Sequence, residues 1–296
     1  MKINKINKSR IHKNSKKMSK KMTKKMSKKM TKKMTKKNKM NGGVNIFSKL
    51  FSSRSPSPSS TKNSEVLNTN SVINPEDFKT TTELSIVSGI MTIGNKTKNL
   101  KGLEIVKIVD EIVKALFLSG KSLESLDISN NNMTDEQIVS IIDTLLLNNI
   151  NLITLKLSGN TIGSKSIYSI GKLLKKNTQL KSLDISKSGL QAIHINYLHI
   201  ELKQNTTLKT LDISDNSIGN EDDTYKHLAG IYIGHIIKDT TLTELYINNN
   251  PFTTKNSQIT SIILALQKNK TITDMHFTSN EEINKLLDRN KKLKKI

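Results

Sequence analysis

The chain has 296 residues, with 48 Lys and Arg against 25 Asp and Glu, which gives a formal net charge of +23. It contains no cysteine, which excludes disulfide staples, thiolate nucleophiles and cysteine-ligated zinc. A membrane-spanning helix needs about 18 consecutive apolar residues, and no such run is present. The lysine-rich start is also unlike a secretory signal peptide, so we expect a protein of the cytoplasm or nucleus.

The basic charge is concentrated at the N-terminus. Residues 1–64 contain 21 Lys and Arg and no acidic side chain, whereas the rest of the chain contains 27 basic and 25 acidic ones. Within residues 16–37 the unit Lys-Lys-Met-Ser/Thr repeats every four residues. Because lysines four residues apart repel each other on a helix, we expect residues 1–43 to be a disordered polybasic tail.

A tail of this composition suits anionic partners, and we assign nucleic acid or an anionic membrane to residues 1–40. Nucleic acid would bind by counterion release, although no aromatic residue precedes Phe47 to stack on bases. A membrane would attract the lysines and could accept a short apolar wedge made of Val44, Ile46, Phe47, Leu50 and Phe51. A mitochondrial presequence is a third reading, disfavoured because such presequences favour arginine and residues 1–64 contain only Arg10 and Arg54.

Residues 44–80 form a linker that contains serine and proline. Its centre reads Arg54-Ser55-Pro56-Ser57-Pro58, a pattern typical of a flexible connection. Ser55 and Ser57 are candidate phosphorylation sites. Phosphate there would add negative charge beside the tail and weaken its hold on anions.

Residues 81–296 form the folded domain. The apolar stretch Leu84–Ile93 and the helical pattern Leu103–Leu118 predict an N-terminal cap or a degenerate first repeat over residues 81–122. From residue 123 onward, six segments follow the template L-x-x-L-x-L-x-x-N, with Ser188 as the only exception at the ninth position, and their starts are 29, 28, 28, 34 and 30 residues apart. They are LESLDISNN at 123, LITLKLSGN at 152, LKSLDISKS at 180, LKTLDISDN at 208, LTELYINNN at 242 and ITDMHFTSN at 272.

Each template predicts one short strand followed by one helix. Leu126 and Ile128 are two residues apart, so in an extended strand they face the core while Asp127 faces solvent. The linker that follows places apolar residues at helical spacing, namely Ile138, Ile141, Ile142 and Leu145. No single repeat can bury its own apolar stripe, so stacking of neighbouring repeats must stabilise the array.

The template resembles the ribonuclease-inhibitor-like class of leucine-rich repeats. This resemblance implies an α/β solenoid, with parallel strands on the concave face and helices on the convex face. It also implies that the ninth-position asparagine is buried and bonds to the backbone of adjacent turns. The long fourth repeat predicts an extended helix or an inserted loop.

The exposed strand positions predict a surface that binds another protein. One column reads Asp127, Lys156, Asp184, Asp212, Tyr246 and His276, and the column beside it includes Glu244 and Asp274. Tyr246 is the best candidate anchor because tyrosine is enriched at binding hot spots. No nucleotide-binding loop, nucleophile elbow or paired metal-binding histidines occur, so we expect neither an enzyme nor a cofactor, metal ion or small-molecule substrate.

These features predict an intracellular scaffold or adaptor. One alternative is a GTPase-activating protein of the Ran-activating type, because that family is built on the same repeat class; its acidic tail is missing here. A second alternative is a fragment of a sensor or receptor whose repeats belong to a larger chain.

Overall fold

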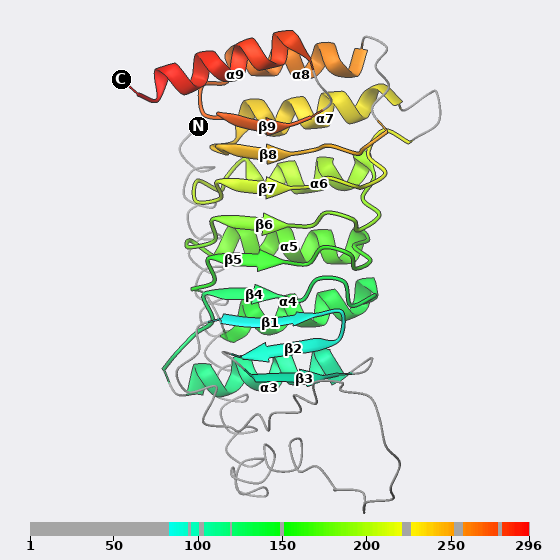
Figure 1. Ribbon diagram of the computed structural model, residues 1–296, viewed down its shortest axis with the longest axis vertical. Coiled ribbons are helices and arrows are strands. Elements are labelled where there is room, and N and C mark those ends of the chain that lie inside the picture. The colour runs from blue at the N-terminus through cyan, green and yellow to red at the C-terminus, as the bar shows by residue number, and fades with distance from the viewer. Residues whose placement is uncertain are drawn as a thin grey trace, which may run out of the picture. The chain divides into compact units, whose positions relative to one another are not determined.

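A computed structural model describes residues 83–93, 96–100, 104–118, 120–148, 151–220, 226–251, 257–277 and 280–295 of the chain. The predictions for the tail, the linker, Ser55 and Ser57 fall outside these residues. Within them, nine strands form one sheet in the order β3-β2-β1-β4-β5-β6-β7-β8-β9. The helices form a second layer behind the sheet (Figure 1).

Six strands lie at the predicted template positions and pair in parallel. They are β4 (Ser125–Asp127), β5 (Thr154–Lys156), β6 (Ser182–Asp184), β7 (Thr210–Asp212), β8 (Glu244–Tyr246) and β9 (Asp274–His276). Their central residues stand opposite one another in the order Leu126, Leu155, Leu183, Leu211, Leu245 and Met275. The predicted solenoid of strands and helices with a parallel sheet is therefore confirmed.

One helix follows each of these strands. The helices are α4 (Asp135–Asn148), α5 (Ser164–Lys176), α6 (Ala192–Leu202), α7 (Lys226–Asp239), α8 (Ser257–Lys268) and α9 (Glu281–Leu293). The predicted stripe of α4, from Ile138 to Leu145, is buried between helix and sheet. The leucines at the centres of β4 to β8 are fully buried against it and its counterparts, which forms one continuous apolar core.

The ninth-position asparagines join neighbouring coils, as predicted. The Asn160 amide donates to the backbone oxygens of Ile128 at 2.9 Å and Leu157 at 2.8 Å. Its oxygen accepts from the backbone N–H groups of Asn131 at 3.2 Å and Met133 at 3.0 Å. Asn131, Asn216 and Asn250 repeat the bridging pattern. Asn280 differs, because its side chain accepts from the N–H of Ile283 and caps α9.

The N-terminal part extends the sheet. Strand β1 (Glu83–Val87) pairs in parallel with β4, with Leu84 opposite Leu126, and α3 (Glu104–Leu118) packs against α4. Strands β2 (Ile90–Ile93) and β3 (Lys96–Asn99) then add an antiparallel pair at the edge. This region thus combines a repeat-like strand and helix with a hairpin that the sequence did not reveal.

The extra length of the fourth repeat lies before the described part of α7. This part of α7 has 14 residues, the same number as α4, so the choice between an extended helix and an inserted loop concerns residues 221–225, which lie outside the described residues. The additional residues lie between the end of β7 and Lys226, a connection that includes the undescribed residues 221–225.

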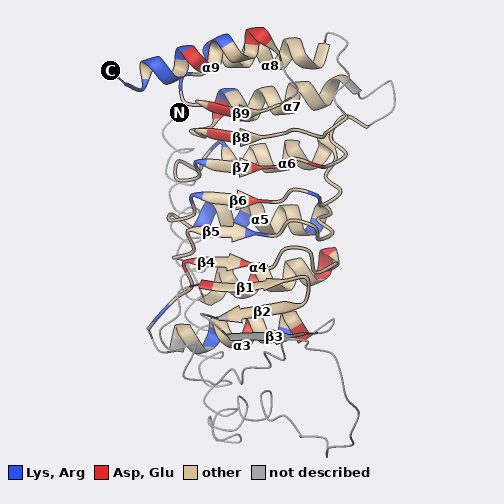
Figure 2. Cartoon of the chain, viewed as in Figure 1, with Lys and Arg blue, Asp and Glu red and all other residues tan. Residues whose placement is uncertain are grey.

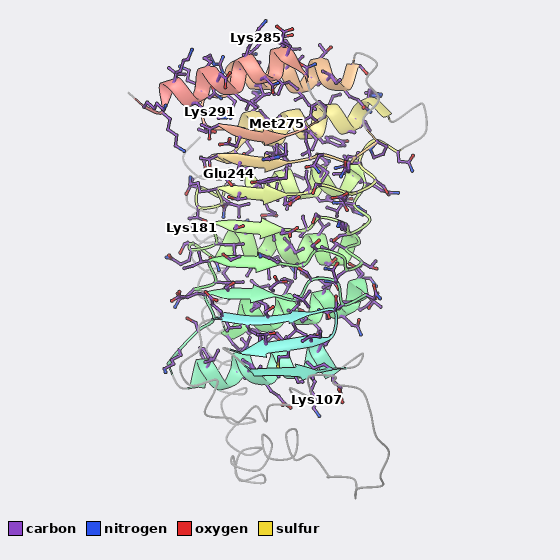
Figure 3. All side chains as sticks on the ribbon, viewed as in Figure 1. Lys107, Lys181, Glu244, Met275, Lys285 and Lys291 are labelled. Carbon is purple, nitrogen blue, oxygen red and sulfur yellow. The ribbon has the colours of Figure 1, made fainter. Side chains whose placement is uncertain are left out.

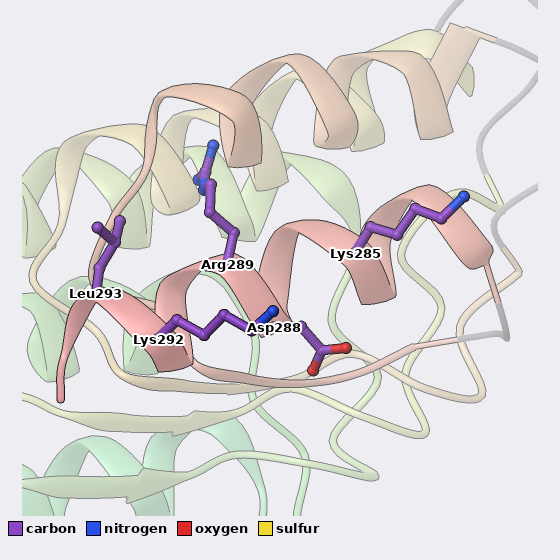
Figure 4. Close-up of a pocket in the computed structure, with 5 residues that line it drawn as sticks. All are labelled: Lys285, Asp288, Arg289, Lys292 and Leu293. Carbon is purple, nitrogen blue, oxygen red and sulfur yellow. The ribbon is translucent and has the colours of Figure 1, made fainter.

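Helix α9 covers the C-terminal end of the array. Arg289 donates to the backbone oxygens of Leu266, Gln267 and Asn269 at 2.6–2.9 Å, which satisfies carbonyls at the end of α8. Figure 4 shows this arginine in a shallow hollow on α9, beside Lys285, Asp288, Lys292 and Leu293. Because the guanidinium is already bound to α8, we assign the hollow a structural role.

Candidate functional site

The predicted binding residues lie side by side on the exposed face of the sheet, which we call the strand face. Residue 127 stands opposite 156, 184 opposite 212, and Asp212 opposite Tyr246, as the parallel register requires. Glu244 and Asp274 occupy the neighbouring column of the same face. Figure 3 shows Glu244 at the edge where the strands begin, the edge on which Lys181 also lies.

Three of the aspartates also stabilise the turn that follows their strand. The carboxylates of Asp127, Asp184 and Asp212 each accept a hydrogen bond from the N–H group two residues later, at 2.9–3.0 Å. The hydroxyl groups of Ser186 and Ser214 donate to the same oxygens of Asp184 and Asp212, at 2.7 and 2.6 Å. The repeated Asp-Ile-Ser of the template is the sequence signal for this turn. These aspartates therefore have a local role besides facing solvent.

The carboxylates of the strand face differ in how they are neutralised. Lys156 lies 3.6 Å from Asp127, and Lys291 of α9 lies 3.2 Å from Asp274. Within the described residues, Asp184, Asp212 and Glu244 have no ion-pair partner within 4.0 Å, although Glu244 accepts a hydrogen bond from the Thr210 hydroxyl at 3.1 Å. Strands β6 to β8 therefore present three unneutralised carboxylates; acidic residues on these strands are coloured red in Figure 2.

Two aromatic rings stack at the C-terminal end of the strand face. The rings of Tyr246 on β8 and His276 on β9 have centroids 4.3 Å apart and are inclined by 13°. Parallel pairing places the two residues opposite each other. The resulting flat apolar surface is flanked by the carboxylates of Glu244 and Asp274, so it suits a group that combines a planar or apolar body with positive charge.

The titration behaviour of this region reflects its carboxylates. Burial raises the pKa of Tyr246, and the nearby charges of Glu244, Asp212 and Asp274 raise it further. Burial also raises the pKa of the Asp212 carboxyl, assisted by Asp184 and Asp215 and opposed by the hydrogen bonds from Ser214. Burial alone would raise the pKa of Asp274, but the hydrogen bonds from Thr273 and Lys291 lower it. The potential around Tyr246 is therefore negative.

The described part of the chain holds no group of three or more His, Asp or Glu side chains placed to bind a metal ion. Of the two histidines of α6, His194 accepts from the Gln191 N–H at 3.0 Å as part of a helix cap. His199 lies 3.0 Å from Asp239 of α7, a partner that the sequence did not suggest. No described helix has the length and apolar character to span a bilayer.

Comparison with known proteins agrees with the fold. The sequence pattern described as "Leucine Rich repeat" matches residues 121–140, 148–171 and 204–222, which cover β4, β5 and β7. The chain is a leucine-rich-repeat protein. Assignment to the ribonuclease-inhibitor-like class remains a prediction from the template.

Two solved structures are similar to about half of the chain. The actin-binding site 2 structure of leiomodin-1 is 19% identical, with a TM-score of 0.45, and the match covers 52% of this chain and 89% of that one. The tropomodulin C-terminal domain of Caenorhabditis elegans is 12% identical, with a TM-score of 0.44, and the match covers 53% and 95%. None of the curated proteins compared with this leucine-rich-repeat protein matches it.

Proposed function

We propose that this protein is a scaffold or adaptor whose strand face binds a protein segment that carries Lys or Arg side chains. The observation that best supports this proposal is the stacked Tyr246–His276 pair, which lies beside carboxylates without an ion-pair partner on the consecutive strands β6, β7 and β8. A guanidinium or ammonium group would gain cation–π attraction from Tyr246 and an ion pair with Glu244.

The strand face is suited to this role because it is rigid. The backbone on either side of each exposed residue is held by pairing with the neighbouring strand and by the bridging ninth-position asparagines, such as Asn216 and Asn250, which we call the asparagine ladder. A partner therefore meets positioned side chains and loses little free energy to ordering them. Tyr246 would contribute most because aromatic anchors dominate interface energetics.

Proximity labelling in cells with the full chain and with Tyr246→Ala tests the proposal. We expect that a set of proteins with segments rich in Lys or Arg is labelled by the wild-type chain and is no longer labelled by the Tyr246→Ala variant. A matched control is Leu147→Ala on α4, which removes an exposed apolar side chain far from the strand face. Equal labelling by both variants would contradict the proposal, and stimulation of GTP hydrolysis by a small GTPase would favour the GTPase-activating alternative instead.

A further inference from the structure

Helix α6 has an unusual outward face. Ile193, Tyr197 and Ile200 are 43%, 46% and 51% exposed and are spaced four and three residues apart, so they form one stripe on the solvent side. The opposite side of α6 is also apolar, with Ile195 and Leu198 in the core. A surface helix normally carries polar residues on its outer face, and an outer apolar stripe marks a binding surface.

The neighbouring helices extend this apolar surface. Tyr168 of α5 is 60% exposed and Leu264 of α8 is 54% exposed, and both lie near the middle of their helices. Between α7 and α8 is a hollow of about 280 Å³, lined on its apolar side by Ile231, Gly234, Leu264 and Ala265. Together with the α6 stripe, these residues form what we call the helix patch.

The hollow follows from close packing of α7 on α8. A Cβ atom on Gly230 would come within 2.4 Å of the Gln258 Cα, and one on Gly234 within 3.1 Å of the Ser261 carbonyl oxygen. The glycines allow the two backbones to approach, and the small Gly234 and Ala265 leave space on the outer side that larger side chains would fill. An inserted apolar side chain from another molecule would fill the same space.

A row of lysines borders the helix patch. The strands from β4 to β9 are parallel and a helix follows each, so the C-terminal ends of the helices lie along one edge (Figure 1). Each of the helices α5 to α8 has an exposed lysine within one residue of its C-terminal end, namely Lys176, Lys203, Lys238 and Lys268. Among the described residues, the only carboxylate within 4.0 Å of this row is Asp239, which also pairs with His199. The row therefore carries excess positive charge.

From these observations we infer that the helix patch is a second binding surface, and that its partner is an amphipathic helix with an apolar stripe bordered by a row of Asp or Glu. Adjacent helices in proteins lie about 8–10 Å apart, so α5 to α8 span roughly 30 Å, the length of a helix of about 20 residues. The lysines are three to ten residues beyond the apolar side chains of the same helices, which places them about 5–15 Å to one side of the stripe. A partner helix with carboxylates along only one side of its apolar stripe would match both the apolar helix patch and the lysine row beside it.

A second copy of the chain fits the helix patch less well. The five exposed side chains together offer on the order of 400 Å² of apolar surface, whereas a stable dimer needs about 800 Å² from each copy. Two copies would also bring the four-lysine rows, and a net charge of +23 each, toward each other. An acidic helix instead gains from the same charges.

The test uses the full chain and three synthetic 20-residue peptides. The first is a helix with a leucine stripe bordered by glutamates; the second has the same composition in scrambled order; the third has lysines in place of the glutamates. The basic residues 1–64 attract the first two peptides equally, so the ratio of their dissociation constants isolates the helix patch. We expect the ordered acidic peptide to bind at least tenfold more tightly than the scrambled one, by fluorescence anisotropy at fixed salt.

Variants locate the binding surface. The double variant Tyr197→Ser, Ile200→Ser should bring the ordered peptide to the affinity of the scrambled one, while Leu147→Ser on α4 and Tyr246→Ala on the strand face leave the ratio unchanged. Replacing Lys203, Lys238 and Lys268 with alanine should weaken the ordered peptide about three- to tenfold at low salt. The same replacement of Lys285 and Lys292 on α9 serves as the charge control. Circular dichroism would establish that each variant is folded.

The opposite outcomes are distinct. Equal affinity for ordered and scrambled peptides, retention of the preference in the double variant, or tighter binding of the basic peptide would each overturn the inference. A dimer in analytical ultracentrifugation that the double variant dissociates would assign the patch to a second copy. Binding of phosphatidylserine vesicles that falls with the double variant, without a peptide preference, would assign it to a membrane. Because Tyr246→Ala tests the strand face separately, either proposal can fail alone.

Discussion

Single polar side chains join the coils of this protein at fixed points. Asn160 satisfies backbone groups of two adjacent turns, and Asp135 of α4 accepts hydrogen bonds from the N–H groups of Gly163 and Ser166 at the start of α5. Burial would raise the pKa of the Asp135 carboxyl, but the hydrogen bonds from Ser166, Gly163 and Lys165 lower it. Such residues convert stacked apolar coils into one defined register.

Removing a ladder asparagine should be costly. Asn160→Ala deletes five hydrogen bonds and leaves buried backbone groups without partners, at about 1–3 kcal/mol each where no other group replaces them. We expect the free energy of unfolding, measured in urea, to fall by roughly 2–4 kcal/mol. Asn151→Ala is the control, because the Asn151 side chain is exposed and, among the described residues, its amide donates a single hydrogen bond, to the Ser122 hydroxyl. An equal effect of the two variants would refute the structural role of the ladder.

His194 should make stability depend on pH. Burial lowers its pKa, against the opposing charge of Asp135, so the folded protein keeps the ring neutral while its Nδ1 accepts from Gln191. The stabilisation is complete above the unfolded pKa of about 6.5 and is lost as pH falls through the folded pKa. His194→Gln keeps an acceptor at this capping position without titrating. Between pH 7.5 and 5, its free energy of unfolding should fall less than that of the wild type. His227→Gln, at an exposed site, should behave as the wild type does.

At the scale of elements, the packing of neighbouring helices is set by how closely their backbones approach. Gly171 of α5 faces the flexible Glu201 side chain, whose Cγ would lie 2.8 Å from an added Cβ. Gly230 of α7 faces the Gln258 backbone, which cannot move aside without shifting α8. The same residue type therefore has different importance in the two helices.

Substituting each glycine with alanine separates these cases. Gly171→Ala should be neutral or stabilising by up to about 1 kcal/mol, because alanine favours the helix and Glu201 can rotate away. Gly230→Ala gains the same propensity but should destabilise by roughly 1–3 kcal/mol through overpacking. Urea unfolding of the two variants measures the difference. A Gly230→Ala protein as stable as Gly171→Ala would show that α7 and α8 are not in this close contact.

The sequence predicted the elements whose signal repeats and missed those that occur once. Strand register was predictable because Leu126 and its equivalents recur in one template and must all face the core. The β2–β3 hairpin has no second copy, and the Arg289 cap depends on where α9 meets α8. For the candidate site, the template placed Tyr246 beside His276, but ring stacking depends on side-chain torsions that no spacing specifies. The apolar outer face of α6 was missed because apolar residues lie on both its core side and its solvent side, which leaves no clear helical period.

The whole folded unit is a linear array in which each coil touches only its neighbours. In such an array, stability is approximately a sum of terms for each coil and each contact between coils. A substitution at one end of the array therefore changes the local stability of nearby coils more than that of coils at the other end. The N-terminal end is extended by β2 and β3, whereas the C-terminal end depends on α9 alone among the described residues.

Helix α9 should therefore open first. It buries only two apolar side chains, Ile283 and Leu287, whereas α4 buries four. Arg289→Ala removes three hydrogen bonds to carbonyls at the C-terminal end of α8. We expect amide hydrogen exchange in α9 to accelerate about tenfold or more, because a loss of about 1.4 kcal/mol of local stability corresponds to a factor of ten. Exchange in β4 to β6 should stay unchanged because those strands are several coils away. Lys285→Ala, on the same helix, is the matched control. If Arg289→Ala accelerated exchange uniformly from β4 to α9, the array would be unfolding as one cooperative unit, and the description by neighbouring contacts would be wrong.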